Sequence, residues 1–140
     1  MKLPYHVFCD EWHPRLYQLS DGRFQIMEDG QLSPMMVGYG YVLVESPFAR
    51  YIEELVLERV RIADAAIYDP RSKEEIRSYR QLRVNQHFSP AMIRDLDLEG
   101  ERFLLMNDKC LFASPELKKR LEISPFRYLR FTEGLSGFAG

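Results

Sequence analysis

One pattern occurs twice in this chain: an apolar run, a Ser-Pro pair, an amphipathic segment and a second apolar run. The later copy, residues 109–131, contains Ser114 and Pro115, residue types that suit a helix N-cap and the first helical position. Leu117 and Leu121 follow one helical turn apart, so they share one face. This copy therefore predicts a strand, a capped helix and a second strand.

The earlier copy begins with the apolar run 41–44 and the pair Ser46-Pro47, about 70 residues before its counterpart. Residues 57–67 are predicted to form one long strand after its helix. The two units together predict an α+β fold, a single domain over residues 1–140 in which both helices cover a shared mixed sheet. The apolar stripe of the first helix is predicted to consist of four residues: Phe48, Ile52, Leu55 and Val56.

The remaining elements are predicted from turn signals and apolar runs. Asp21-Gly22 is typical of a hairpin turn between two short strands. Residues 31–40 are expected to be irregular, with Tyr39 and Tyr41 packing in the core or a loop, and Ser89-Pro90 to open a short helix. Residues 1–38 thus form an irregular, strand-rich N-terminal part. Strands are expected at 3–8, 16–19, 23–27, 74–84 and 103–106.

The composition is that of an ordinary globular chain, with 46% hydrophobic and 29% charged residues and a net charge of −2. This near-neutral charge gives no reason to expect a nucleic acid or an anionic membrane as partner. The first residues lack the apolar stretch of a signal peptide, and no run approaches the ~20 apolar residues that span a bilayer. We therefore expect a cytoplasmic protein that does not contact a membrane.

The tightest cluster of reactive residue types is Cys9, Asp10 and His13. A Cys–His pair could form a nucleophile or begin a metal site, but neither a motif for an oxyanion hole nor a full ligand set accompanies it. Cys9 and the distant Cys110 are expected to be buried free thiols. We therefore expect no catalytic residue, cofactor or metal, and keep a small cysteine-dependent enzyme as the alternative.

Two charged series are candidates for contact with a partner. In the first, Asp95, Asp97, Glu99 and Glu101 alternate, so on an extended segment their four carboxylates would lie on one side. The segment lacks the glycine and the spacing of a calcium loop, and a solvated connector is the alternative.

The second series is basic and surrounds Tyr79. Arginines beside an aromatic residue can bind RNA, but Glu74 and Glu75 interrupt this series. Internal salt bridges or a protein interface are therefore the preferred interpretations. The basic residues are Arg71, Lys73, Arg77, Arg80 and Arg83.

Residues 40–133 resemble a family of bacterial immunity proteins that are encoded beside polymorphic toxin genes. The resemblance lies in 42–55, in 60–70, in 111–121 and in the closing run Leu129-Arg130-Phe131. The family usually has a glycine before its closing strand, where this chain has Ser124-Pro125.

The resemblance implies a non-catalytic protein that binds a cognate toxin and blocks its active site or the entry of its substrate. Such an inhibitor would use an aromatic or arginine anchor within ~800 Å² of surface per partner. The sequence leaves open whether the protein is a monomer or a homodimer, and an adaptor of unknown partner is the other alternative. We predict the interface at Arg77, Tyr79, Arg80, Asp95, Asp97 and Glu99.

Overall fold

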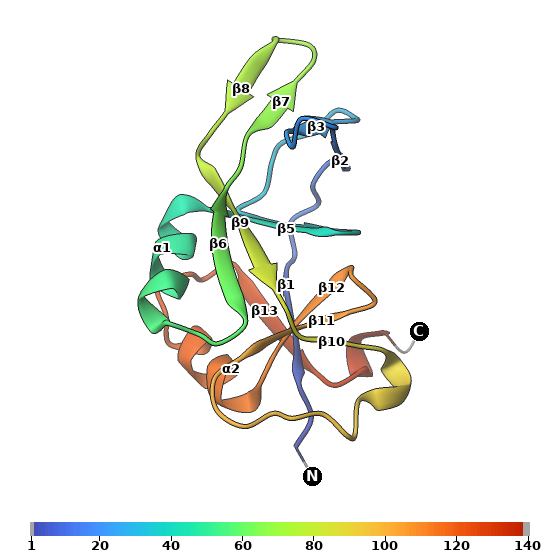
Figure 1. Ribbon diagram of the computed structural model, residues 1–140, viewed down its shortest axis with the longest axis vertical. Helices are drawn as coiled ribbons and strands as arrows, with labels where there is room; N and C mark the ends of the chain where they lie inside the picture. Colours follow the sequence, from blue (N-terminus) through green and yellow to red (C-terminus); the bar gives the residue numbers. More distant parts are fainter. Residues whose placement is uncertain (1, 139–140) are drawn as a thin grey trace.

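The computed structural model describes residues 2–138 and arranges them in three sheets and two α-helices (Figure 1). The five-stranded sheet has the order β10-β11-β12-β1-β13, the central sheet β4-β5-β9-β6, and the hairpin sheet β2-β3-β7-β8. In the five-stranded sheet the strands are β10 His87–Phe88, β11 Phe103–Met106, β12 Cys110–Ala113, β1 Tyr5–Cys9 and β13 Leu129–Glu133. In the central sheet they are β4 Met35–Gly38, β5 Tyr41–Glu45, β9 Tyr79–Val84 and β6 Val60–Asp64. The hairpin sheet contains β2 Leu16–Gln18, β3 Phe24–Ile26, β7 Ile67–Asp69 and β8 Glu74–Ile76.

The helices are α1 Ser46–Leu55 and α2 Pro115–Glu122, and short 3-10 turns lie at Pro90–Met92 and Ser136–Phe138. Neither α-helix in the described part of the chain is long and apolar enough to cross a membrane.

The repeat in the sequence is a repeat in the structure. Each copy consists of a hairpin, a helix and a strand: β4-β5-α1-β6 and β11-β12-α2-β13. In both copies a strand from elsewhere in the chain separates the two strands that flank the helix and runs antiparallel to each of them. That strand is β9 in the first copy and β1 in the second. The α+β class and the repeated unit are confirmed.

The two helices, however, pack on different sheets instead of covering a shared one. Helix α1 lies against β5, β9 and β6, whereas α2 lies against β12 and β13. Both helices still contribute to one hydrophobic core, because the central and five-stranded sheets contact each other through it. The buried residues of this core include Val7, Val44, Phe48, Ile52, Leu82, Phe103, Leu111, Leu117 and Leu121.

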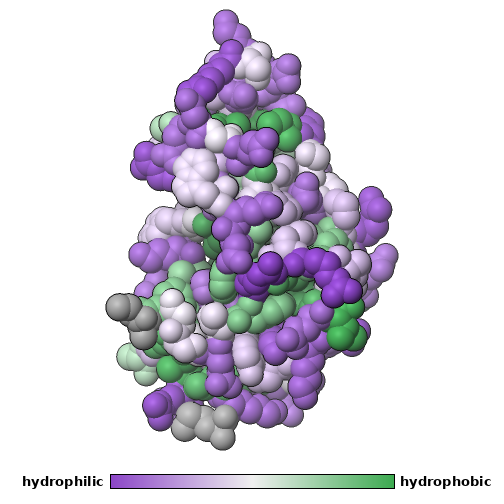
Figure 2. All heavy atoms as spheres, turned by 180° about the vertical axis from the view of Figure 1, so that it is seen from behind, coloured by the Kyte–Doolittle hydropathy of each residue, from purple (hydrophilic) through white to green (hydrophobic). Residues whose placement is uncertain are grey.

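The central sheet and the five-stranded sheet each have a second face, and a further hydrophobic cluster packs on each of these faces. Phe24 and Ile67 of the hairpin sheet pack on Leu43 of the central sheet. Ile93 and Leu98, from the segment before β11, join Phe112 of the five-stranded sheet. Seen from behind, hydrophilic residues dominate the projecting tip of the hairpin sheet, and hydrophobic residues reach the surface more widely over the lower half (Figure 2).

Four local predictions are wrong. The predicted strand 74–84 is interrupted at residues 77–78, because β8 belongs to the hairpin sheet and β9 to the central sheet. Residues 31–40 are not wholly irregular, because β4 begins after Pro34, and its first two side chains, Met35 and Met36, are buried in different cores. The predicted strand 57–67 breaks at residues 65–66, since β6 and β7 belong to different sheets. Val56 does not lie on the buried stripe: α1 ends at Leu55, and Val56 is 84% exposed.

The predicted N-cap is correct in one copy and wrong in the other. Ser114 is fully buried, and its Oγ accepts from the backbone N–H of Leu117 (3.4 Å) and of Arg102 (3.0 Å). The same hydroxyl donates to the carbonyl of Gly100 at 2.7 Å. Ser46 does not cap α1, because its hydroxyl donates to the carbonyl of Ser78 just before β9, at 2.9 Å.

Ser114→Ala is expected to lower the free energy of unfolding by about 1–3 kcal/mol, because it removes a cap and leaves the partly buried N–H of Arg102 without its partner. The matched variant Ser46→Ala removes one hydrogen bond at a partly exposed site and should cost less than about 1 kcal/mol. Urea unfolding of both variants measures the difference. Equal losses in the two copies would contradict the assigned roles.

His6 of β1 lies among aromatic rings on the outer face of the five-stranded sheet. Its ring centroid is 4.9 Å from that of Phe8, 5.3 Å from Phe112 and 4.7 Å from Phe138. Burial disfavours the imidazolium and lowers the pKa of His6 to about 4.

The depressed pKa of His6 predicts that the folded state loses stability on acidification. Between the unfolded pKa of about 6.5 and the folded value of about 4, the unfolded chain binds the proton more readily, so stability falls as the pH drops through this window. The loss from His6 should reach about 1–2 kcal/mol after allowance for its partial exposure. His6→Phe should flatten the stability profile between pH 6.5 and 4 in urea titrations. An unchanged slope would contradict the prediction.

Candidate functional site

The predicted basic residues do not form one surface. Tyr79 is buried and its hydroxyl donates to the carbonyl of Ser33 at 2.8 Å, while burial raises its pKa to about 12. Arg80 Nε lies 3.3 Å from Asp64 Oδ1, an ion pair without hydrogen-bond geometry. Arg77 pairs with Glu75 at 3.2 Å. This part of the predicted interface is therefore partly core and partly internal ion pairs.

In the acidic series, Asp95, Asp97 and Glu99 are exposed, whereas Glu101 is half-buried and forms an ion pair with Arg120. Asp97 pairs with Arg102 at 3.3 Å, and its carbonyl accepts from Gln86 at 3.1 Å, beyond the C-terminal end of β9.

Arg77, in contrast, precedes the N-terminal end of β9. Because β9 separates them, Arg77 does not lie beside Asp97.

A different surface gathers exposed aromatic and methionine side chains. Tyr39, in the turn between β4 and β5, is 78% exposed, and Tyr17 and Met92 are 61% and 48% exposed. Tyr39 lines two open hollows, of about 730 Å³ and 510 Å³. We call this region the Tyr39 surface. Its other lining residues include His13, Arg15, Phe88, Asn107 and Asp108.

The Tyr39 surface is built where the equivalent turns of the two copies meet. Gly40 has a φ of +81°, and its N–H donates to the carbonyl of Asp108 at 2.8 Å. Asp108 occupies the matching turn between β11 and β12, and its carboxylate lies 3.3 Å from His87 Nδ1. This turn-to-turn bond fixes the backbone beside Tyr39, so the exposed ring is presented from a held position.

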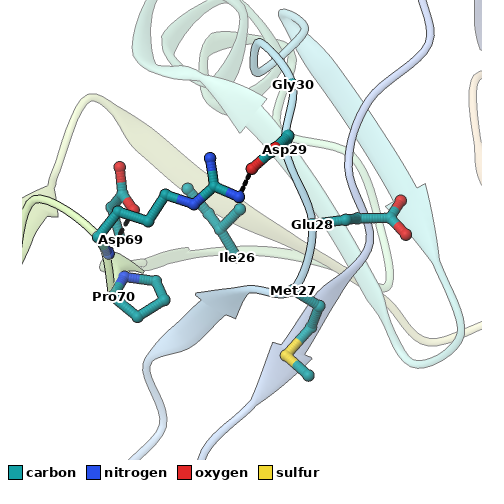
Figure 3. A pocket seen from close by; sticks show the side chains of 8 residues that line it. Ile26, Met27, Glu28, Asp29, Gly30, Asp69 and Pro70 are labelled. Atoms are coloured by element: carbon teal, nitrogen blue, oxygen red, sulfur yellow. Dashed lines mark hydrogen bonds and ion pairs between the residues drawn. The ribbon is translucent and has the colours of Figure 1, made fainter.

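A smaller, polar hollow of about 140 Å³ lies between the end of β3 and the turn from β7 to β8. Figure 3 shows Asp29 and Asp69 on different sides of this hollow. Arg71 forms an ion pair with Asp29, and its backbone N–H donates to Asp69 Oδ1 at 3.0 Å. We interpret these contacts of Arg71 as structural, because they hold two loops of the hairpin sheet together.

The Cys9 cluster has no arrangement that activates the thiol. Both Cys9 and Cys110 are free and partly buried, and burial raises the pKa of each thiol. His13 Nδ1 donates to the carbonyl of Pro14 at 2.8 Å. Within residues 2–138, no group of three or more His, Cys, Asp and Glu side chains is placed to hold a metal ion.

Cys9 is therefore expected to react slowly with a thiol probe at neutral pH, because its raised pKa keeps the thiolate fraction small. Labelling followed by mass spectrometry should show slower modification of Cys9 in the native protein than in a denatured control. Faster labelling of the native protein would favour the cysteine-dependent enzyme instead.

Comparisons of the chain with protein-family models, with curated proteins and with solved structures found no match. Tyr39 is the main site residue that sequence reasoning missed, since it was grouped with Tyr41 as a packing residue. Tyr41 is indeed buried, whereas Tyr39 is exposed. The available signal was the pair Gly38 and Gly40, which marks Tyr39 as part of a tight turn.

Proposed function

We propose that this protein is a non-catalytic immunity protein that binds a cognate toxin domain and blocks its active site. The resemblance of residues 40–133 supports the class of partner. The observation that carries the binding role is Tyr39, an aromatic ring that is 78% exposed on a turn held by the bond from Gly40 to Asp108. Aromatic side chains presented from a rigid backbone supply large contact area at low entropic cost, as interface anchors do.

In this proposal, the protein inhibits the toxin by filling its active site with a complementary surface, and no residue of the inhibitor takes part in a reaction. Tyr39 enters the substrate cleft of the toxin, and Tyr17 and Met92 pack around the entrance. The open hollows on either side of Tyr39 receive side chains of the toxin. A contact of ~800 Å² on each partner would suffice for a stable complex. The complex forms in the cytoplasm, where it protects the producing cell.

The test is recovery of the partner with tagged protein from the native lysate, followed by co-expression with the recovered chain. One stoichiometric partner with an enzymatic domain, and protection of the cells that express both, are expected. Tyr39→Ser should weaken the complex by about 2 kcal/mol or more, as loss of an aromatic anchor does. Ile123→Ser is the matched control, because Ile123 is 85% exposed at the end of α2 and away from this surface.

Two outcomes would contradict the proposal. A recovered partner without enzymatic activity would favour an adaptor. Equal binding by the Tyr39→Ser variant and the wild-type chain would exclude the Tyr39 surface as the contact, even if a toxin were recovered.

A further inference from the structure

Strand β6 forms an edge of the central sheet (Figure 1). On one side it pairs with β9, from Val60 opposite Val84 to Asp64 opposite Arg80. Within residues 2–138 no strand pairs with its other side. The outer edge of β6 therefore presents backbone N–H and C=O groups that an extended segment could pair with.

A small hollow, lined mainly by apolar residues, lies beside this strand. It has a volume of about 200 Å³ and is placed between β6 and the C-terminal end of α1. Its lining is Ile52, Glu53, Val56, Leu57, Val60 and Ile62. Glu53 is the one charged residue of this lining. A strand edge with an adjoining side-chain pocket is the arrangement by which domains recognise extended peptides, because the edge supplies affinity and the pocket supplies selectivity.

Val56, at this hollow, is both strained and exposed. Its φ of +52° places a β-branched residue in the left-handed region, and its side chain is 84% exposed. The corresponding residue after α2, Ile123, has an ordinary φ of −93°. Glycine or asparagine would relieve the backbone strain at Val56, so a valine there is not explained by folding.

The opposite face of β6 places two like charges in register. Arg61 lies directly opposite Arg83 on β9, and both side chains are exposed. In the described part of the chain, neither has a carboxylate within ion-pair distance, although Arg83 Nε donates to Gln81 at 3.4 Å. Like charges placed opposite each other on neighbouring strands destabilise a sheet. An acidic residue on a strand added beside Arg61 would pair with this positive charge.

We propose that the outer edge of β6 binds an extended segment of a partner protein in which apolar and acidic residues alternate. The segment adds a strand to the central sheet through main-chain hydrogen bonds. Its apolar side chains point to the hollow between Val56 and Ile62, where Glu53 disfavours an acidic residue, and its acidic side chains point to the face of Arg61. The β4–β5 turn that carries Tyr39 lies toward the opposite edge of the sheet, so this proposal does not depend on toxin neutralisation.

The test uses fluorescein-labelled synthetic peptides of about seven residues, the length of an ordinary strand. Fluorescence anisotropy measures the Kd for a peptide of alternating leucine and glutamate, and amide hydrogen exchange locates it. We expect saturable binding and slower exchange of the amides in β6, residues 60–64. A peptide of alternating leucine and lysine, and one with the leucines and glutamates in separate blocks, should each bind about tenfold more weakly or worse.

Two variants test the contacts one at a time. Val56→Asn removes the apolar side chain while favouring the left-handed backbone, so binding should weaken about tenfold without loss of thermal stability. Arg61→Glu should reverse the preference between the glutamate and lysine peptides. Ile123→Asn is the matched control, an equally exposed apolar residue after the other helix, and should leave the Kd unchanged.

Three results would overturn the proposal. They are the absence of saturable binding to the leucine–glutamate peptide, binding without added protection in β6, and equal weakening by Val56→Asn and Ile123→Asn.

Discussion

The pairing of β1 between β12 and β13 is the constraint on which the fold depends. Tyr5 faces Ala113 on one side and Glu133 on the other, so a strand from the start of the chain joins two strands from its end. Strands β12 and β13 flank α2 and do not pair with each other, because β1 lies between them and runs antiparallel to both. Without β1 they would have no common neighbour. Val7 of β1 also enters the core shared by both copies. Formation of the second copy therefore requires contacts between the two ends of the chain, which are slow to form.

The two copies have the same order of elements, and they differ at the residues that form the two proposed binding surfaces. Gly40 and Asp108 occupy matching turns and bond to each other, but only the first of these turns carries an exposed tyrosine. Val56 and Ile123 follow the two helices, and only Val56 is held in the left-handed region beside a hollow. The Tyr39 surface and the hollow beside Val56 are both supported by secondary structure. Tyr39 lies in the short turn between two strands, and Val56 directly follows a helix.

Local rules explain the parts of the fold that could be predicted. Asp21-Gly22 closes the β2–β3 hairpin, Ser114 caps α2, and the run 103–106 is a strand, since each depends on residues close in sequence. Rules that depend on neighbouring residues could not predict the candidate site. Tyr39 and Tyr41 are two residues apart with similar composition around them, yet one is exposed and the other buried.

By itself, the sequence determined the α+β class, the repeated strand–helix–strand unit and most strand positions, because capping and periodicity act over a few residues. Only the tertiary structure decided which strands share a sheet, that Ser46 bonds to Ser78 instead of capping α1, and that Tyr79 is buried against Ser33. Each of these outcomes depends on a partner far away along the chain. The periodicity of a segment specifies that one of its faces is buried, but the rest of the chain decides what covers that face.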